Sequence, residues 1–163
     1  MVGTNNETTR ILLGMLTGDP MLAMESAKEV IGSPTAVEPS LLGEIASNKL
    51  YKKWSRIAAV YALGFLEHKG SATTLIRILK NPHEDPNLRG HVAEALGNMR
   101  ERKATVELGK ILFGRGQLPL KKWCIYALAE IGGNQAGSIL RQFQATRPTG
   151  VAAKELKSAL RKI

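Results

Sequence analysis

Apolar residues recur at helical spacing between residues 85 and 112, with polar residues on the remaining faces. The first stripe has the spacing i, i+3, i+4, i+7, which places its members on one side of a helix. Its members are Val92, Ala95, Leu96 and Met99. A polar turn at 98–103 interrupts the pattern, and a second, shorter stripe follows through Leu108 and Leu112. The pattern predicts a helix–turn–helix hairpin.

The same hairpin recurs along the chain at a nearly constant interval. An Ala-Leu pair marks the first helix of each unit, and successive pairs are 33, 32 and 32 residues apart. The four pairs are Ala62-Leu63, Ala95-Leu96, Ala127-Leu128 and Ala159-Leu160. Second helices align as well, through Leu75, Leu108 and Leu140. Because neither helix of a unit can bury its stripe alone, the repetition predicts stacked hairpins that share one continuous core.

We expect residues 1–163 to form a single all-α domain. Turn residues divide it into about four hairpins, with a capping helix at each end. The units are expected at 20–48, 50–80, 85–113 and 118–144, the caps at 7–17 and 151–163, and a disordered lead-in at 1–6. The first unit should begin at Asp19-Pro20, because Asp caps a helix and Pro at the first helical position loses no hydrogen bond.

Composition agrees with closely packed helices, since aromatic residues make up 5% of the chain. The single cysteine, Cys124, shares a column with Ala59 and Val92 and is expected to be a buried small apolar residue. The sequence contains no run of about 18 apolar residues, so it predicts no membrane-spanning helix. The N-terminus also lacks the pattern of a signal peptide. We therefore expect a cytoplasmic protein.

The third unit resembles the short HEAT repeats that are named after phycobilin (PBS) lyases. The resemblance rests on Asp85, Pro86, Arg89, Ala95, Leu96 and Gly97. It extends from about residue 20 to the end, although Lys121 and Ala129 replace the family's Arg and Gly in the fourth unit. The resemblance implies a right-handed α-α superhelix whose second helices line the concave side. The family mixes scaffolds, binding modules and a few enzymes, so the resemblance says little about activity.

The resemblance also implies a structural role for two arginines. Arg56 and Arg89 share a column, and the family's arginine bonds the loop of the neighbouring unit. Asp85 lies four residues before Arg89, within reach of a helical ion pair. Trp54 and Trp123 lie near helix starts and are expected to pack at unit edges rather than to contact a partner. These residues are therefore left out of the candidate site.

Charge is distributed unevenly along the chain, whose formal net charge is +9. Residues 1–48 hold two basic and six acidic side chains, a net charge of −4. Residues 49–163 hold 21 basic and eight acidic side chains, a net charge of +13. A segment so one-sided repels itself, which indicates an anionic partner or a negatively charged surface.

Seven cations form the candidate partner-binding surface. They are Arg77, Lys110, Arg141, Lys52, Lys53, Lys121 and Lys122. The first three lie on second helices, one repeat apart to within one residue, and would form a basic stripe on the side expected to be concave. The four lysines lie at or near the starts of first helices, where the helix dipole disfavours cations. The structural alternative is that these long side chains cover apolar surface with their stems.

No catalytic or metal-binding arrangement is recognisable in the sequence. The histidines are His68, His83 and His91. They lack metal-ligand spacing with one another and with Cys124. His83-Glu84 is one His-Glu dipeptide, whereas the HEAT-repeat enzyme deoxyhypusine hydroxylase binds iron through several. Glu67 and Glu84 flank loops but lack partners. We expect a non-enzymatic protein with no metal and no cofactor.

Three functional hypotheses from different classes remain. The leading one is a scaffold or binding module that holds an acidic partner protein on the basic surface. A second is nucleic-acid binding through phosphates, which the isoelectric point of 9.9 favours and the acidic first third opposes. A third is a phycobilin lyase-type enzyme or an accessory subunit of one, which the repeats alone suggest. The sequence leaves the partner's identity, the oligomeric state and the curvature of the stack open.

Overall fold

The computed structural model describes residues 3–115 and 118–163. Over these residues the chain forms ten α-helices and two short 3-10 turns, and no strand. The N-terminal helix is α1 (Gly3–Leu16). The first helices of the units are α2 (Pro20–Gly32), α4 (Lys53–Phe65), α6 (Pro86–Asn98), α8 (Leu118–Ile131) and α10 (Gly150–Ala159). The second helices are α3 (Pro39–Ser47), α5 (Ala72–Lys80), α7 (Thr105–Phe113) and α9 (Gly133–Ala145), with 3-10 turns at Lys69–Ser71 and Arg102–Ala104. The predicted all-α class is confirmed.

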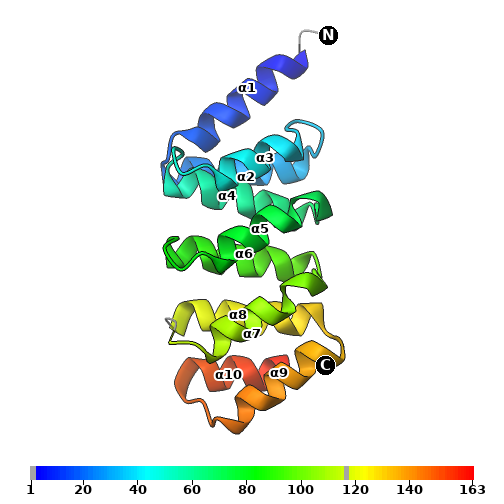
Figure 1. Cartoon of the computed structure of the whole chain (residues 1–163). Coiled ribbons are helices and arrows are strands. Elements are labelled where there is room, and N and C mark those ends of the chain that lie inside the picture. The colour runs from blue at the N-terminus through cyan, green and yellow to red at the C-terminus, as the bar shows by residue number, and fades with distance from the viewer. Residues whose placement is uncertain (1–2, 116–117) are drawn as a thin grey trace.

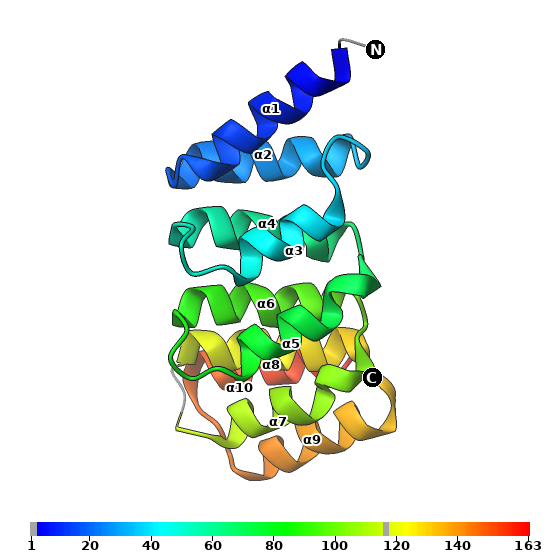
Figure 2. The ribbon, with the colours of Figure 1, turned by 45° about the horizontal axis from the view of Figure 1, so that its top comes forward.

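The helices are stacked in two layers along one axis (Figures 1 and 2). The first helices pack on one another in chain order, from α2 through α4, α6 and α8 to α10. The second helices form the other layer, where α3 packs on α4, α5 on α6 and α7 on α8. Each second helix thus approaches the first helix that follows it, and the hairpins interlock. This is an α-solenoid, in which every unit supplies part of its neighbour's core.

Small residues allow the first helices to approach closely. A Cβ atom at Gly64 in α4 would lie 2.8 Å from the Cα of Ala95 in α6, and one at Gly97 would lie 2.8 Å from the Cα of Ala127 in α8. Real Cβ atoms do not come so near to backbone, so both positions require glycine at this helix spacing. The repeated alanines are 0% (Ala62), 2% (Ala95), 0% (Ala127) and 4% (Ala159) exposed. The column predicted from the sequence therefore forms the contact between successive first helices.

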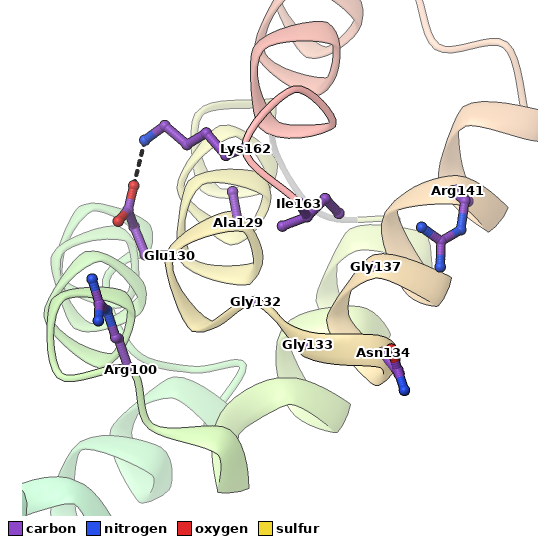
Figure 3. A pocket seen from close by; sticks show the side chains of 10 residues that line it. All are labelled: Arg100, Ala129, Glu130, Gly132, Gly133, Asn134, Gly137, Arg141, Lys162 and Ile163. Carbon is purple, nitrogen blue, oxygen red and sulfur yellow. Dashed lines mark hydrogen bonds and ion pairs between the residues drawn. The ribbon is translucent and has the colours of Figure 1, made fainter.

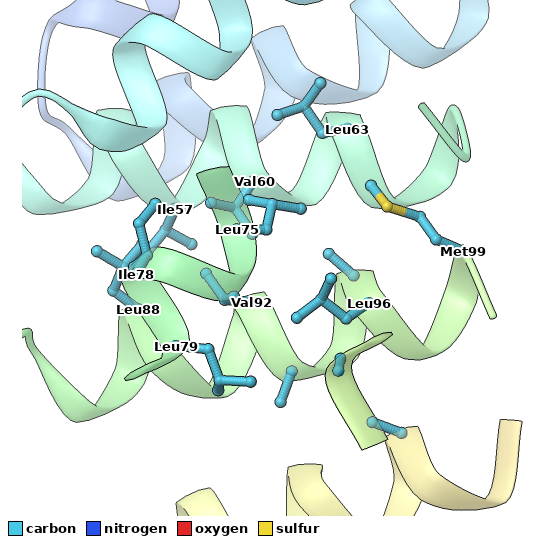
Figure 4. Packing of buried hydrophobic residues seen from close by; sticks show 14 of the residues in the cluster. Ile57, Val60, Leu63, Leu75, Ile78, Leu79, Leu88, Val92, Leu96 and Met99 are labelled. Carbon is cyan, nitrogen blue, oxygen red and sulfur yellow. The ribbon is translucent and has the colours of Figure 1, made fainter. Parts of the chain in front are cut away.

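One apolar core runs the length of the stack, from Ile11 in α1 to Ala159 in α10. Figure 4 shows its middle, where side chains of α4, α5 and α6 meet. Ile57, Ile78 and Leu88 come from these three helices and lie together, each at most 4% exposed. Removing one helix would therefore expose apolar side chains of two others, which makes folding of the units interdependent.

Helix starts follow local chemistry. The carboxylate of Asp19 accepts hydrogen bonds of 2.9 Å from the backbone N–H groups of Met21 and Leu22, and Asp85 caps α6 in the same way. Both helices have Pro at the first position, as expected for the first unit. Helix α3 begins at Pro39, because a proline inside the helix would remove one of its hydrogen bonds, whereas at the first position no bond is lost.

The chain ends differ from the sequence-based expectation. Helix α1 already includes residues 3–6, where a disordered lead-in was expected; residues 1–2 lie outside the described residues. Burial of Ile11 and Met15 and a 2.7 Å hydrogen bond from the Thr8 hydroxyl to the Ala36 carbonyl hold α1 on the stack. These contacts are tertiary and cannot be read from local sequence. At the other end α10 stops at Ala159, and the last four residues leave the helix.

Candidate partner-binding surface

The second-helix face, which we define as the solvent-facing side of α3, α5, α7 and α9, changes sign along the stack. Helix α3 carries Glu44 and begins after Glu38. The next three second helices carry four cations and one anion: Arg77, Lys80, Lys110, Arg141 and Glu107. Because four positive side chains are balanced by one negative side chain, the electrostatic potential over this part of the face is positive.

The one carboxylate on the basic part of this face is already occupied. Glu107 Oε1 lies 2.7 Å from Lys110 Nζ and 3.8 Å from Lys80 Nζ. Arg77 and Arg141 are exposed, and no ion pair joins either to an acidic group within the described part of the chain. Of the three predicted stripe residues, Lys110 is therefore partly compensated, and the two arginines have guanidinium groups available to an external anion.

Apolar side chains lie among these cations. Ile76, Ile111 and Ile139 are half-buried on the second helices, and Val106 and Phe113 are 48% and 47% exposed. Apolar groups inside a charged rim are the usual composition of a protein-binding surface. The second-helix face thus combines charge complementarity with surface that a partner can bury.

The four predicted lysines lie on or next to the first helices, and three of them have partners within the chain. Lys52 Nζ donates a 2.9 Å hydrogen bond to the carbonyl of Thr17, just beyond the C-terminus of α1. That interaction explains a cation at the start of α4, because it neutralises the negative end of another helix. The ammonium of Lys53 is 3.6 Å from Asp85, and that of Lys122 is 3.5 Å from Glu155. Lys121 is half-buried in α8. The structure therefore does not gather the seven candidates into one patch.

Glu84, which has no partner in the sequence-based interpretation, is in fact paired in the interior. Its two carboxylate oxygens accept hydrogen bonds of 2.9 and 3.1 Å from the Arg56 guanidinium, and both side chains are less than 10% exposed. These hydrogen bonds hold the pKa of Glu84 below its usual value. Lys49 Nζ approaches the same carboxylate at 3.7 Å. Glu84 thus fastens the loop before α6 to α4.

The repeated arginines bind the preceding unit. Arg56 Nε donates to the Ala46 carbonyl at 2.9 Å, and Arg89 Nε donates to the Leu79 carbonyl at 3.0 Å, each at the end of a second helix. The expected ion pair between Arg89 and Asp85 is not formed. Asp85 instead caps α6, because its carboxylate is turned toward the first N–H groups of that helix. Both arginines act in the architecture and not in the candidate site.

The remaining singled-out residues are packed into the stack. Trp123 in α8 covers Gly90 of α6, where an added Cβ would lie 2.7 Å from the indole Cδ1, and Trp54 also packs against the core. Cys124 is fully buried, and this burial raises the pKa of its thiol to about 12. His91 Nδ1 lies 3.2 Å from Glu94. In the described part of the chain no three His, Cys, Asp or Glu residues are grouped so that they could hold a metal ion.

Sequence reasoning missed a second basic feature at the edge of the stack. Two adjoining hollows of about 520 and 390 Å³ share the turn between α8 and α9, at Gly132, Gly133 and Asn134. Arg100 and Arg141 line the larger hollow, where Figure 3 shows them on either side of the turn, and Arg102 lines the smaller one. The charged residues at 100–103 could have indicated this basic feature, but their pattern was interpreted only as a polar turn.

Comparison with known proteins agrees with these observations. The family model described as HEAT repeats matches residues 40–112 and 72–161. No curated protein matches the chain. A solved structure of the complex of CpcE and CpcF of phycocyanin lyase from Nostoc sp. PCC7120 is similar, with a TM-score of 0.71 and 19% sequence identity. The match covers 95% of this chain, which spans 64% of that neighbour's length.

Stacked hairpins with close-packed first helices define an α-solenoid. The chain belongs to the HEAT-repeat family, since the family model covers most of its length. The structural match likewise confirms the HEAT-like fold that the sequence predicted. None of the helices in the described residues is both long and apolar enough to cross a membrane.

Proposed function

We propose that this protein is a non-enzymatic scaffold that holds an acidic partner protein on the basic part of its second-helix face. The observation that carries the proposal is the imbalance of charge from α5 to α9, where Arg77 and Arg141 are exposed and form no ion pair within the described residues, and Glu107 is shared by two lysines. Guanidinium groups bind carboxylates in bidentate geometry, so both arginines suit acidic side chains. The half-buried isoleucines between them supply area that a protein partner can cover.

A matched pair of charge-reversal variants tests the proposal. Arg77→Glu, Lys110→Glu and Arg141→Glu together reverse the basic part of the face. Lys28→Glu, Lys154→Glu and Lys157→Glu change the net charge equally at exposed positions of α2 and α10. Proteins captured from a native lysate by the wild-type chain should be lost from the first variant and retained by the second. Equal capture by all three proteins would contradict the proposal, and so would equal losses from both variants.

Nucleic acid is the principal alternative partner, because the net charge of +9 attracts phosphates as well as carboxylates. It is tested by titrating the chain with duplex DNA of arbitrary sequence at several salt concentrations. Affinity that falls steeply with salt and does not depend on the sequence of the duplex would favour nucleic acid over the acidic protein. Salt-tolerant binding of one captured protein would support the main proposal.

A lyase-type or lyase-accessory role is suggested by the structural neighbour, which is a complex of two subunits of phycocyanin lyase. At 19% identity this similarity concerns the fold, and the role would require that the chain bind a bilin or a bilin-carrying protein. Incubation with free bilin followed by gel filtration tests it directly. Visible absorbance that elutes with the chain would favour this role over the scaffold.

A further inference from the structure

The turn between α8 and α9 lies in a basic hollow that shares Arg141 with the second-helix face and extends beyond it. The hollow and its smaller neighbour are lined by Arg100, Arg102, Arg141 and Lys162. Among the described residues of the lining, Glu130 is the one acidic side chain, and it is hydrogen-bonded to Lys162 (Figure 3). Three arginines are therefore left around the turn, and no ion pair joins any of them to another described residue.

Glycine at three positions shapes this hollow. Gly132 and Gly133 have φ values of 63° and 78°, in the left-handed region that favours glycine, so the turn has no side chains that would fill the space. At Gly137, one turn into α9, an added Cβ would lie 3.2 Å from Arg141 Nη1. The bare backbone thus lets the guanidinium of Arg141 fold back along α9 toward the turn.

The backbone adds to the positive charge instead of neutralising it. Helices α2 and α6 begin with an aspartate cap, whereas α9 begins after Gly132 and has no side-chain cap. The first N–H groups of a helix point out of its N-terminus and carry a partial positive charge. At α9 this end therefore reinforces the field of the three arginines.

We propose that this hollow binds a phosphate monoester. Arginine binds phosphate through paired N–H donors. A phosphate monoester is doubly charged and has more acceptor oxygens than a carboxylate, so it can bind several guanidinium groups at once. The larger hollow, about 520 Å³, has room for more than a bare phosphate, so the group belongs to a larger molecule. That molecule is either a phosphorylated serine or threonine of a polypeptide or a small phosphorylated metabolite. The site shares Arg141 with the second-helix face but uses neither Arg77 nor Lys110, so variants of Arg100 and Arg102 test it separately from the proposed function.

Titration of the ¹⁵N-labelled chain with inorganic phosphate, followed by NMR, tests the proposal. We expect saturable shifts of the backbone amides of Gly132, Gly133 and Asn134, and much smaller ones with chloride or acetate at equal ionic strength. The variant with Arg100→Gln and Arg102→Gln should bind phosphate at least about tenfold more weakly, because it lacks two charge-assisted donors. The matched control with Lys28→Gln and Arg115→Gln removes the same charge far from the hollow and should bind as the wild type does.

Three results of these titrations would overturn the phosphate site. One is an equal response to acetate, another is unchanged binding by the Arg100 and Arg102 variant, and the third is an equal loss in the control variant. A phosphoserine peptide and ribose 5-phosphate then distinguish the two sources of the group. The source that competes with inorganic phosphate at lower concentration is the one the site accepts, and failure of both to compete would also refute the proposal. Thermal melts of each variant confirm that the fold is retained.

Discussion

Replacing Glu84 by Gln tests whether the interior ion pair stabilises the stack. The side chains of Arg56 and Glu84 are 9% and 7% exposed, and two hydrogen bonds of 2.9 and 3.1 Å join them. The substitution leaves the buried guanidinium without its counter-charge. Breaking a buried ion pair costs about 3–5 kcal/mol, and the amide of Gln still offers one acceptor oxygen. We therefore expect the free energy of unfolding to fall by about 3 kcal/mol.

Urea unfolding followed by circular dichroism at neutral pH measures this loss. The control is Glu107→Gln, which breaks a pair at the surface, where Lys110 is 66% exposed. Surface ion pairs contribute at most about 1 kcal/mol, so the control should lose much less. A loss for Glu84→Gln no greater than that of the control would refute the claim that burial makes this pair important.

The same variant gives a pH test with a defined sign. Hydrogen bonds from Arg56 lower the pKa of Glu84 in the folded chain from its ordinary value of 4.5. A carboxyl group with a lowered folded pKa stabilises the fold fully above its unfolded pKa, and this stabilisation is lost as the pH falls through the folded pKa. The difference in stability between wild type and Glu84→Gln should be constant from neutral pH to about 5 and shrink in stronger acid. A difference that does not change with acidification would contradict the assignment.

Further predictions concern packing, backbone and reactivity. Gly64→Ala should destabilise the chain by about 1–3 kcal/mol in urea unfolding, because its Cβ would meet the backbone of Ala95; Gly32→Ala, with open space around it, should not. Gly132→Ala should cost about 1–3 kcal/mol in the same assay, because φ 63° with ψ −164° is a backbone conformation essentially confined to glycine; an unchanged midpoint would contradict the strain. Cys124 should react with a thiol reagent at neutral pH only in denaturant, since burial raises its pKa to about 12; rapid reaction of the native chain would contradict its burial.

Several features of the candidate site could be placed from the sequence. The exposure of Arg77, Lys110 and Arg141 follows from helical periodicity, because positions between apolar columns of a second helix face solvent. Whether each cation is free could not be predicted. Lys52 bonds a carbonyl 35 residues away, and Arg56 pairs with a carboxylate 28 residues away. Such partners depend on how one unit is seated on the next.

The sequence by itself determined the helices, their repeat and the columns that pack, because helical spacing and small residues act over a few positions and recur in every unit. Only the tertiary structure decided which charges are compensated and where the surface is hollowed. The Glu84 carboxylate meets Arg56 from another unit, and the basic hollow joins side chains from the turns of two neighbouring units and the last residues of the chain. These contacts between units depend on the distance and rotation between stacked helices, which no local sequence pattern specifies.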